Sequence, residues 1–222
     1  MNNSKVSRLF SAKYVTTLAV LLALVVLFQV FGSYIKIGTT SFSFVLVPIV
    51  LGGVLLGVIA GAILGFAFSL VVMIMGLVGA DPFTGVLLND ALFGTLSAIY
   101  LKGILAGVIP ALLYKVIANK NTLVAVIVAS LTAPIVNTGI FIVCMLIIGD
   151  VVTANFIDGG MSLIYFLVIV CAGINFLVEF AINLVLSPAI HRIIVALGLV
   201  DKRGQISTVE DVSENDSQDK TI

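Results

Sequence analysis

Charged residues are scarce in this sequence, since Asp, Glu, Lys and Arg make up only 10% of its 222 residues. Soluble domains carry about 25% charged residues, so a soluble fold built from this chain would have a poorly hydrated surface. The 11 basic residues balance 11 acidic residues, which excludes a nucleic-acid-binding protein because such a protein needs a basic surplus. With 61% apolar residues and a mean hydropathy of +1.28, the composition predicts a single polytopic membrane domain.

Residues that carry catalysis or bind metals are also few. The sequence contains no phosphate-binding loop, no His-Glu-x-x-His pair and no Gly-x-Ser-x-Gly elbow. Cys144 and Cys171 lie in apolar runs, and we interpret them as small buried thiols. The single histidine, His191, stands beside Arg192 and is interpreted as an interfacial residue. We therefore expect no enzyme activity, no bound metal and no cofactor.

Long apolar runs define the expected architecture. Because about 20 apolar residues cross a bilayer as a helix, we predict six spans, and the charge-free run 37–80 holds two of them with a hinge near Gly57. The fold class is thus an all-α integral membrane protein, a six-transmembrane-helix bundle over residues 14–200. A cytoplasmic segment, 1–13, precedes the bundle, and a disordered acidic cytoplasmic tail, 201–222, follows it. The spans are 14–31, the two within 37–80, 91–116, 122–148 interrupted by Pro134, and 161–194.

The placement of charge predicts how the bundle faces. With six spans, all bases except Lys36 and Lys102 fall at one membrane side, and by the positive-inside rule this side is cytoplasmic. The opposite loops carry acids instead. Both termini are therefore expected in the cytoplasm. The bases that flank the spans are Lys5, Arg8, Lys13, Lys115, Lys120, Arg192, Lys202 and Arg203, and the acids of the outer loops are Asp81, Asp90, Asp150 and Asp158.

Small residues recur at every fourth position, a spacing that lets membrane helices approach closely. One series contains Gly53, Gly57, Gly61 and Gly65, a second contains Gly103, Gly107 and Ala111, and the first helix carries the pair Ala19 and Ala23. The spacing fits packing inside the protein. For the pair on the first helix it fits an outward contact with another membrane subunit equally well.

Polar residues inside the spans are costly and therefore informative. Glu179 is the only acid and Lys102 the only base in a predicted span, and a charge facing lipid costs roughly 2.5–3.5 kcal/mol even on lenient scales. Helix rise places Lys102, Asn137 and Asn175 at overlapping depths in the middle or outer half of the membrane. One interpretation is that these side chains form a polar pocket that opens outward. The other is that Lys102 and Glu179 form an internal pair which, with interhelical amide hydrogen bonds, holds the bundle together, and the two interpretations are compatible. The candidate substrate-binding residues are Lys102, Asn137, Asn175, Glu179, Asn89, Asp90, Phe83 and Tyr100.

The order of these features over residues 14–197 resembles the substrate-binding (S) components of energy-coupling factor (ECF) transporters, which import vitamins into prokaryotes. The matching stretches are the Ala19/Ala23 pair, the glycine ladder from Pro48 to Gly65, in which Val58 replaces a common proline, and Lys102-Gly-Ile-Leu-Ala-Gly107. The resemblance implies a multi-pass protein of the prokaryotic cell membrane. It also implies a separate coupling subunit in contact with Ala19 and Ala23, two ATPase subunits, and a substrate site near the outer face.

The vitamin is suggested by fewer residues. The Lys102-Gly pattern and the loop Asp81-Pro-Phe-Thr84 resemble the riboflavin and pantothenate groups of the family. A lysine can neutralise a carboxylate, which favours pantothenate, whereas Phe83 and Tyr100 could stack on a flavin ring. Two alternatives stay open. One is a stand-alone secondary transporter or channel for a small polar metabolite, although the internal repeat expected of such a protein is not clear in this sequence. The other is a membrane scaffold without a ligand.

Overall fold

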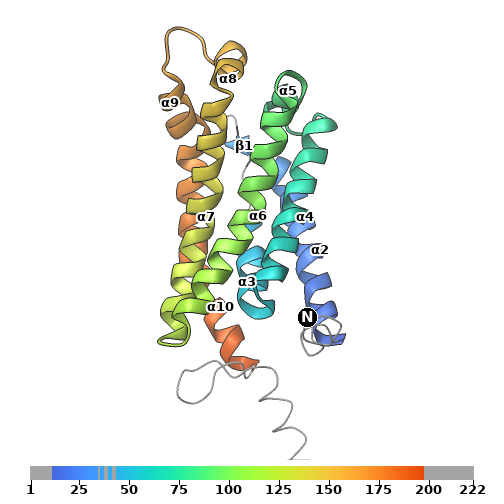
Figure 1. The fold of residues 1–222 in the computed structure, drawn as a ribbon, viewed down its shortest axis with the longest axis vertical. Coiled ribbons are helices and arrows are strands. Elements are labelled where there is room, and N and C mark those ends of the chain that lie inside the picture. Colours follow the sequence, from blue (N-terminus) through green and yellow to red (C-terminus); the bar gives the residue numbers. More distant parts are fainter. Residues whose placement is uncertain (1–11, 35, 38–39, 42–43, 198–222) are drawn as a thin grey trace, which may run out of the picture.

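The computed structural model describes residues 12–34, 36–37, 40–41 and 44–197, which form a bundle of helices running along one long axis (Figure 1). Apart from one short antiparallel strand pair, in which Lys36 is opposite Ser41, the described elements are helices, as predicted. The predicted segments 1–13 and 201–222 lie outside the described residues, except for Ala12 and Lys13. The elements are α2 (Ala12–Tyr34), β1 (Lys36–Ile37), β2 (Thr40–Ser41), α3 (Leu46–Leu56), α4 (Val58–Leu77), α5 (Pro82–Asp90), α6 (Leu92–Ile117), α7 (Thr122–Ile147), α8 (Gly149–Phe156), α9 (Leu163–Tyr165), the π-helix η1 (Phe166–Gly173) and α10 (Ile174–Ala196).

Five helical segments in the described part of the chain are long and apolar enough to cross a membrane. They are Lys13–Gly32, Val58–Leu77, Leu92–Ile117, Thr122–Ile147 and Leu163–Ala196. The remaining predicted span is shorter than expected, because α3 has only 11 residues. At 1.5 Å per residue such a helix is about 16 Å long, roughly half of a 30 Å hydrocarbon core. The prediction of six full-length spans is therefore not confirmed.

Gly57 forms the predicted hinge between α3 and α4. Its φ of 94° and ψ of −179° belong to a region that only glycine occupies readily, and α3 ends one residue before it while α4 begins one residue after it. Gly57 thus separates the first glycine series into two helices, and a Cβ atom at this position would meet no atom within 4 Å.

The other small residues of both series pack α3 and α4 against α6. A Cβ atom added to Gly61 would lie 2.5 Å from the carbonyl oxygen of Gly107. Gly65 and Gly103 approach each other in the same way one turn further along. The Ser69 hydroxyl then donates to the Ile99 carbonyl at 2.8 Å. Internal packing, one of the two expected roles of small residues, is confirmed here, and it sets how closely α4 and α6 approach.

Two of the long helices differ locally from expectation. Helix α7 continues through Pro134 without a break, although proline has no N–H to donate to the carbonyl of Ser130. The last long segment contains the eight-residue π-helix η1 ahead of α10. Such wide turns are frequent at functional sites, and nothing in the hydropathy pattern distinguishes them from an ordinary helix.

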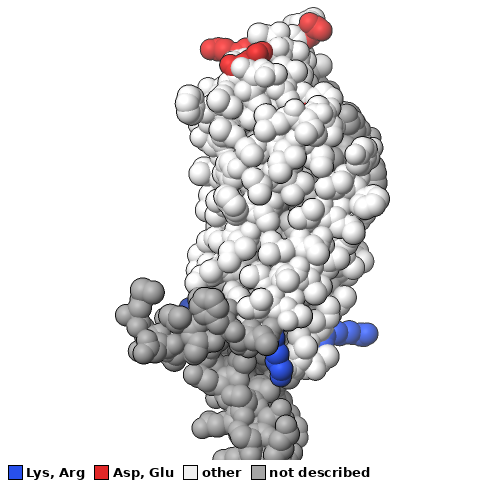
Figure 2. All heavy atoms as spheres, turned by 90° about the vertical axis from the view of Figure 1, so that its right-hand side faces the viewer, with Lys and Arg blue, Asp and Glu red and all other residues white. Residues whose placement is uncertain are grey.

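The ends of the bundle carry opposite charges. Figure 2 shows acidic side chains at one end and basic side chains at the other, with an uncharged surface between them. The exposed acids Asp90, Asp150 and Asp158 belong to α5, α8 and the turn after α8, whereas the exposed bases Lys13, Lys115, Lys120 and Arg192 lie at the far ends of α2, α6 and α10 and in the α6–α7 turn. Among the described residues, the predicted partition of charge is therefore confirmed.

The apolar core has two parts that follow this axis. The larger cluster joins α2, α3, α4, α6, α7 and α10 and includes Ile49, Leu64 and Val126, all fully buried. The smaller cluster lies beneath α5 and α8 and includes Phe83, Val152 and Phe166. The short helices α5 and α8 therefore cover the acidic end of the long-helix bundle (Figure 1).

Candidate functional site

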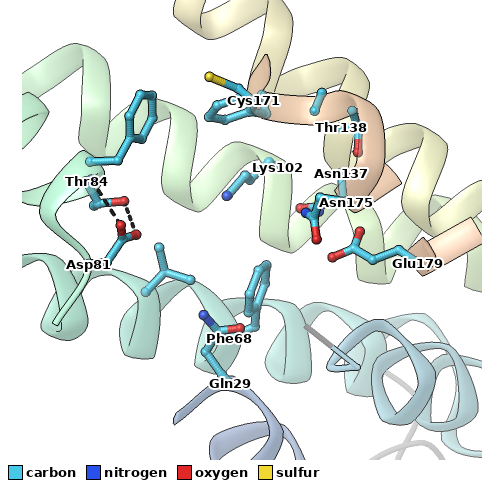
Figure 3. Close-up of a pocket in the computed structure, with 14 residues that line it drawn as sticks. Gln29, Phe68, Asp81, Thr84, Lys102, Asn137, Thr138, Cys171, Asn175 and Glu179 are labelled. Carbon is cyan, nitrogen blue, oxygen red and sulfur yellow. Dashed lines mark hydrogen bonds between the residues drawn. The ribbon is translucent and has the colours of Figure 1, made fainter. Parts of the chain in front are cut away.

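A polar cavity of about 90 Å³ lies inside the bundle where six elements and the start of α5 converge (Figure 3). Its centre is near Lys102, which is ten residues from the start of α6 and hence about 15 Å from the acidic end. Polar and aromatic side chains dominate its walls. The lining residues are Gln29, Phe68, Val72, Asp81, Phe83, Thr84, Lys102, Asn137, Thr138, Phe141, Cys171, Ala172, Asn175 and Glu179.

Lys102 projects into the cavity between two aromatic rings. Its Nζ atom lies 5.8 Å from the ring centroid of Phe68 on α4 and 5.3 Å from that of Phe141 on α7. Both distances are within the range of cation–π attraction. No carboxylate oxygen of a described residue lies within 4.0 Å of this ammonium, so Lys102 and Glu179 do not form the direct internal pair that was one of the two interpretations of the sequence.

Glu179 forms the opposite wall of the cavity and is only 3% exposed. The side-chain amides of Asn137 and Asn175 lie beside its carboxylate, and both stand between Glu179 and Lys102 in Figure 3. Three oxygens of this group have no hydrogen-bond partner among the described residues, namely Glu179 Oε2, Asn137 Oδ1 and Asn175 Oδ1. An unpartnered buried acceptor costs about 1–3 kcal/mol, so the cavity presents acceptors suited to a ligand that brings donors.

Asp81 is the third charged side chain of the cavity. Its carboxylate accepts from the Thr84 hydroxyl at 2.6 Å and from the Thr84 backbone N–H at 3.5 Å, so it caps the N-terminus of α5. The contact with Thr84 is drawn in Figure 3, where both oxygens of Asp81 face that residue. Asp81 is thus engaged by its own helix, and the cavity holds two acids and one base that do not pair directly with each other.

Five of the eight predicted binding residues meet in this cavity, namely Lys102, Asn137, Asn175, Glu179 and Phe83.

The other three predicted residues lie outside the lining. Tyr100 precedes Lys102 by two positions, a rotation of about 200° on a helix. Its ring stacks on Phe66 at 5.4 Å and its hydroxyl lies 3.4 Å from Met73 Sδ. Asn89 is exposed, and Asp90 accepts from the Asn155 amide of α8 at 2.9 Å.

Several residues that line the cavity were not predicted from the sequence. Gln29 and Asp81 had a usable signal, since Gln29 is a polar residue inside the first span and Asp81 opens the Asp-Pro-Phe-Thr loop. Phe68 and Phe141 carried no signal in the sequence that marked them as binding residues, because phenylalanines are spread through many of the apolar runs. Their position beside Lys102 depends on how α4 and α7 are rotated against α6.

Ala19 and Ala23 lie on the outer surface of α2. Both are exposed, and of the five long segments the one in α2 has the smallest buried share. This pair therefore does not pack inside the described bundle, unlike the glycines of α4 and α6. No group of three or more His, Cys, Asp or Glu side chains that could hold a metal ion occurs in the described ranges.

Comparison with known proteins identifies one similarity. A family profile described as "ECF transporter, substrate-specific component" matches residues 13–191, which includes every cavity-lining residue. No curated protein and no solved structure matches the chain.

Proposed function

The chain belongs to the family of ECF transporter substrate-specific components, and we propose that it captures a water-soluble vitamin in the cavity around Lys102 for ATP-driven uptake. Membership makes it a transporter component and not an enzyme. The observation that carries the proposal is that, within the described part of the chain, Lys102 has no carboxylate partner and lies opposite acceptors of Asn137, Asn175 and Glu179 that also lack partners. A buried polar cavity of this kind is costly in a membrane protein and is explained by a ligand.

The chemistry of the cavity favours pantothenate, with riboflavin next. A matching ligand places one anionic group at Lys102 and N–H or O–H donors at the acceptors of Glu179, Asn137 and Asn175. Pantothenate carries a carboxylate, two hydroxyls and an amide N–H, so it supplies both kinds of group. Riboflavin offers hydroxyls but has no charge to balance Lys102.

Binding of a vitamin requires the cavity to enlarge. Its volume of about 90 Å³ is below the roughly 300 Å³ at which small-molecule pockets begin. We expect the cover formed by α5 and α8 to move, because it lies over the acidic end of the bundle. Phe83 of α5 touches Phe156 of α8 with ring centroids 4.7 Å apart, and at the rim Asp90 bonds Asn155.

The charge distribution supports an orientation for this process. The basic end of the bundle, with Lys13, Lys115 and Arg192, is proposed to face the cytoplasm of a prokaryotic cell, and the acidic end above the cavity faces outward. The separate transmembrane coupling subunit is proposed to contact Ala19 and Ala23, and two ATPase subunits supply the energy that reorients the loaded protein.

The test uses the purified full chain in lipid nanodiscs. Thermal shift is measured across a panel of water-soluble vitamins, and small molecules that copurify are identified by mass spectrometry. We expect one vitamin, pantothenate first, to raise the melting temperature. Lys102→Met abolishes this shift, whereas Lys115→Met, the same change on an exposed site of the same helix, preserves it.

Two outcomes contradict the proposal. One is the absence of both a copurified vitamin and a thermal shift with any member of the panel. The other is uptake by the chain alone into liposomes without ATP, which identifies a stand-alone secondary transporter instead.

A further inference from the structure

The three charged side chains of the cavity are each held by a different kind of partner. Asp81 accepts from Thr84. Glu179 is faced by two asparagine amides. Among the described residues, Lys102 has neither a carboxylate within 4.0 Å nor a hydrogen-bond partner, and its ammonium contacts the rings of Phe68 and Phe141.

The free position of Lys102 needs an explanation, because both acids are near enough to attract it. Asp81 and Glu179 are the two carboxylates that act on its charge, and attraction between opposite charges grows as water is excluded. A lysine stem has four carbons and many rotamers, so it can turn toward either acid. Some other contact must hold the ammonium between them.

The two aromatic rings supply that contact. The face of an aromatic ring is negative and attracts a cation within about 6 Å, more strongly where water is scarce. One ring comes from α4 and the other from α7, while Lys102 is on α6, so the three side chains are brought together only by the bundle. In Figure 3 the Lys102 nitrogen points into the open part of the cavity and not at Glu179.

We propose that Phe68 and Phe141 are positioning residues that hold the Lys102 ammonium away from Asp81 and Glu179 and so reserve it for the anionic group of the substrate. This inference rests on the proposed function, since it names how the same cavity selects its ligand. The class selected is a small molecule with one carboxylate and several hydrogen-bond donors. An uncharged analogue of the same shape is discriminated against.

The first test needs no ligand. The protein is labelled with ¹³C at the lysine ε carbon, and its lysine ε-proton resonances are recorded by NMR, with Lys102 assigned through Lys102→Arg. Protons above a ring face are shielded, so the Lys102 resonance is expected upfield of those of the exposed lysines Lys115 and Lys120. In Phe141→Leu it moves toward their position, and in Phe141→Tyr, which keeps a ring, it stays.

Phe141 is chosen over Phe68 because it is half-buried, whereas Phe68 is 4% exposed in the main core. The matched control is Phe156→Leu, since Phe156 belongs to the neighbouring aromatic cluster but does not line the cavity. The control leaves the Lys102 resonance upfield. A Lys102 resonance that coincides with the exposed lysines, or that Phe141→Leu does not move, overturns the inference.

The second test measures selectivity by titration calorimetry with pantothenate and with pantothenol, the alcohol that lacks its charge. Wild type is expected to prefer the carboxylate. Phe141→Leu lowers that preference about tenfold, a size typical of a desolvated cation–π contact, chiefly by weakening pantothenate binding. Phe141→Tyr and Phe156→Leu retain the preference.

The two tests separate the possible failures. If Phe141→Leu weakens both ligands equally, the ring acts on ligand shape and the selectivity role is wrong. If neither wild type nor any variant binds pantothenate while the Lys102 resonance responds as expected, the positioning of Lys102 by the rings stands and the choice of vitamin in the proposed function is wrong.

Discussion

Replacement of Gly61 by alanine tests whether the glycine contacts between α4 and α6 set the geometry of the cavity. A Cβ atom at Gly61 would lie 2.5 Å from the Gly107 carbonyl oxygen and 3.0 Å from its carbon, whereas an ordinary contact begins near 3.4 Å. Both atoms belong to the backbone, so no side chain can rotate away to relieve the clash. The two helices therefore have to separate by about 1 Å, and overpacking of this kind costs about 1–3 kcal/mol.

The separation has a measurable effect on stability. In a chain of this size 1 kcal/mol changes the melting temperature by about 2–4 °C, so Gly61→Ala is expected to melt roughly 2–12 °C below wild type in nanodiscs. The control is Gly139→Ala on α7, where a Cβ would meet no atom within 4 Å. There the better helix propensity of alanine makes the change neutral or stabilising by up to about 1 kcal/mol.

The same change reaches the binding site. Phe68 is on α4 and its ring is already 5.8 Å from Lys102 on α6, close to the 6 Å limit of the interaction. A shift of about 1 Å weakens that contact, so Gly61→Ala should also lower the affinity for the vitamin. Equal stability of Gly61→Ala and Gly139→Ala, with unchanged affinity, would refute the reasoning that these glycines position the site.

Three further predictions concern other parts of the chain. Ala19→Trp and Ala23→Trp should block copurification with the coupling subunit while vitamin binding persists, because both side chains are exposed on α2; lost binding with intact assembly would reverse the assignment. Asp81→Ala should destabilise α5 by about 0.5–2 kcal/mol, as loss of an N-cap does, and should speed hydrogen exchange of the α5 amides. Asp81→Asn keeps the cap and should exchange slowly; if the α5 amides exchange equally fast in both variants, Asp81 is not needed as a cap. Gly57→Ala should lower the free energy of unfolding by about 1–3 kcal/mol although the added methyl group has open space, and an unchanged melting curve would show that this φ is not required.

Local properties of the sequence were enough to predict much of this architecture. Hydropathy located the long helices, and the charge-free length of 37–80 required a break, which occurs at Gly57. The cost of charge in a membrane singled out Lys102 and Glu179, and helix rise placed Lys102, Asn137 and Asn175 at overlapping depths. These inferences succeeded because each depends on a single helix and its solvent.

Contacts between helices could not be predicted in this way. The rotation of α6 turns Tyr100 toward Phe66 and away from the cavity, and the rotations of α4 and α7 bring Phe68 and Phe141 to Lys102. Hydropathy also did not show that α3 is only half a membrane in length or that η1 is a π-helix.

The sequence alone thus determined that one acid and one base lie inside a bundle of apolar helices, because hydration and backbone hydrogen bonding act on each segment by itself. Only the tertiary structure decided that these charges stay apart, with Lys102 between two rings and Glu179 beside two amides. The physical reason is that close backbone contacts, such as those of Gly61 with Gly107, set the depth and rotation of one helix against the next. A displacement of a few ångströms between two helices decides whether a lysine contacts a carboxylate or the face of an aromatic ring.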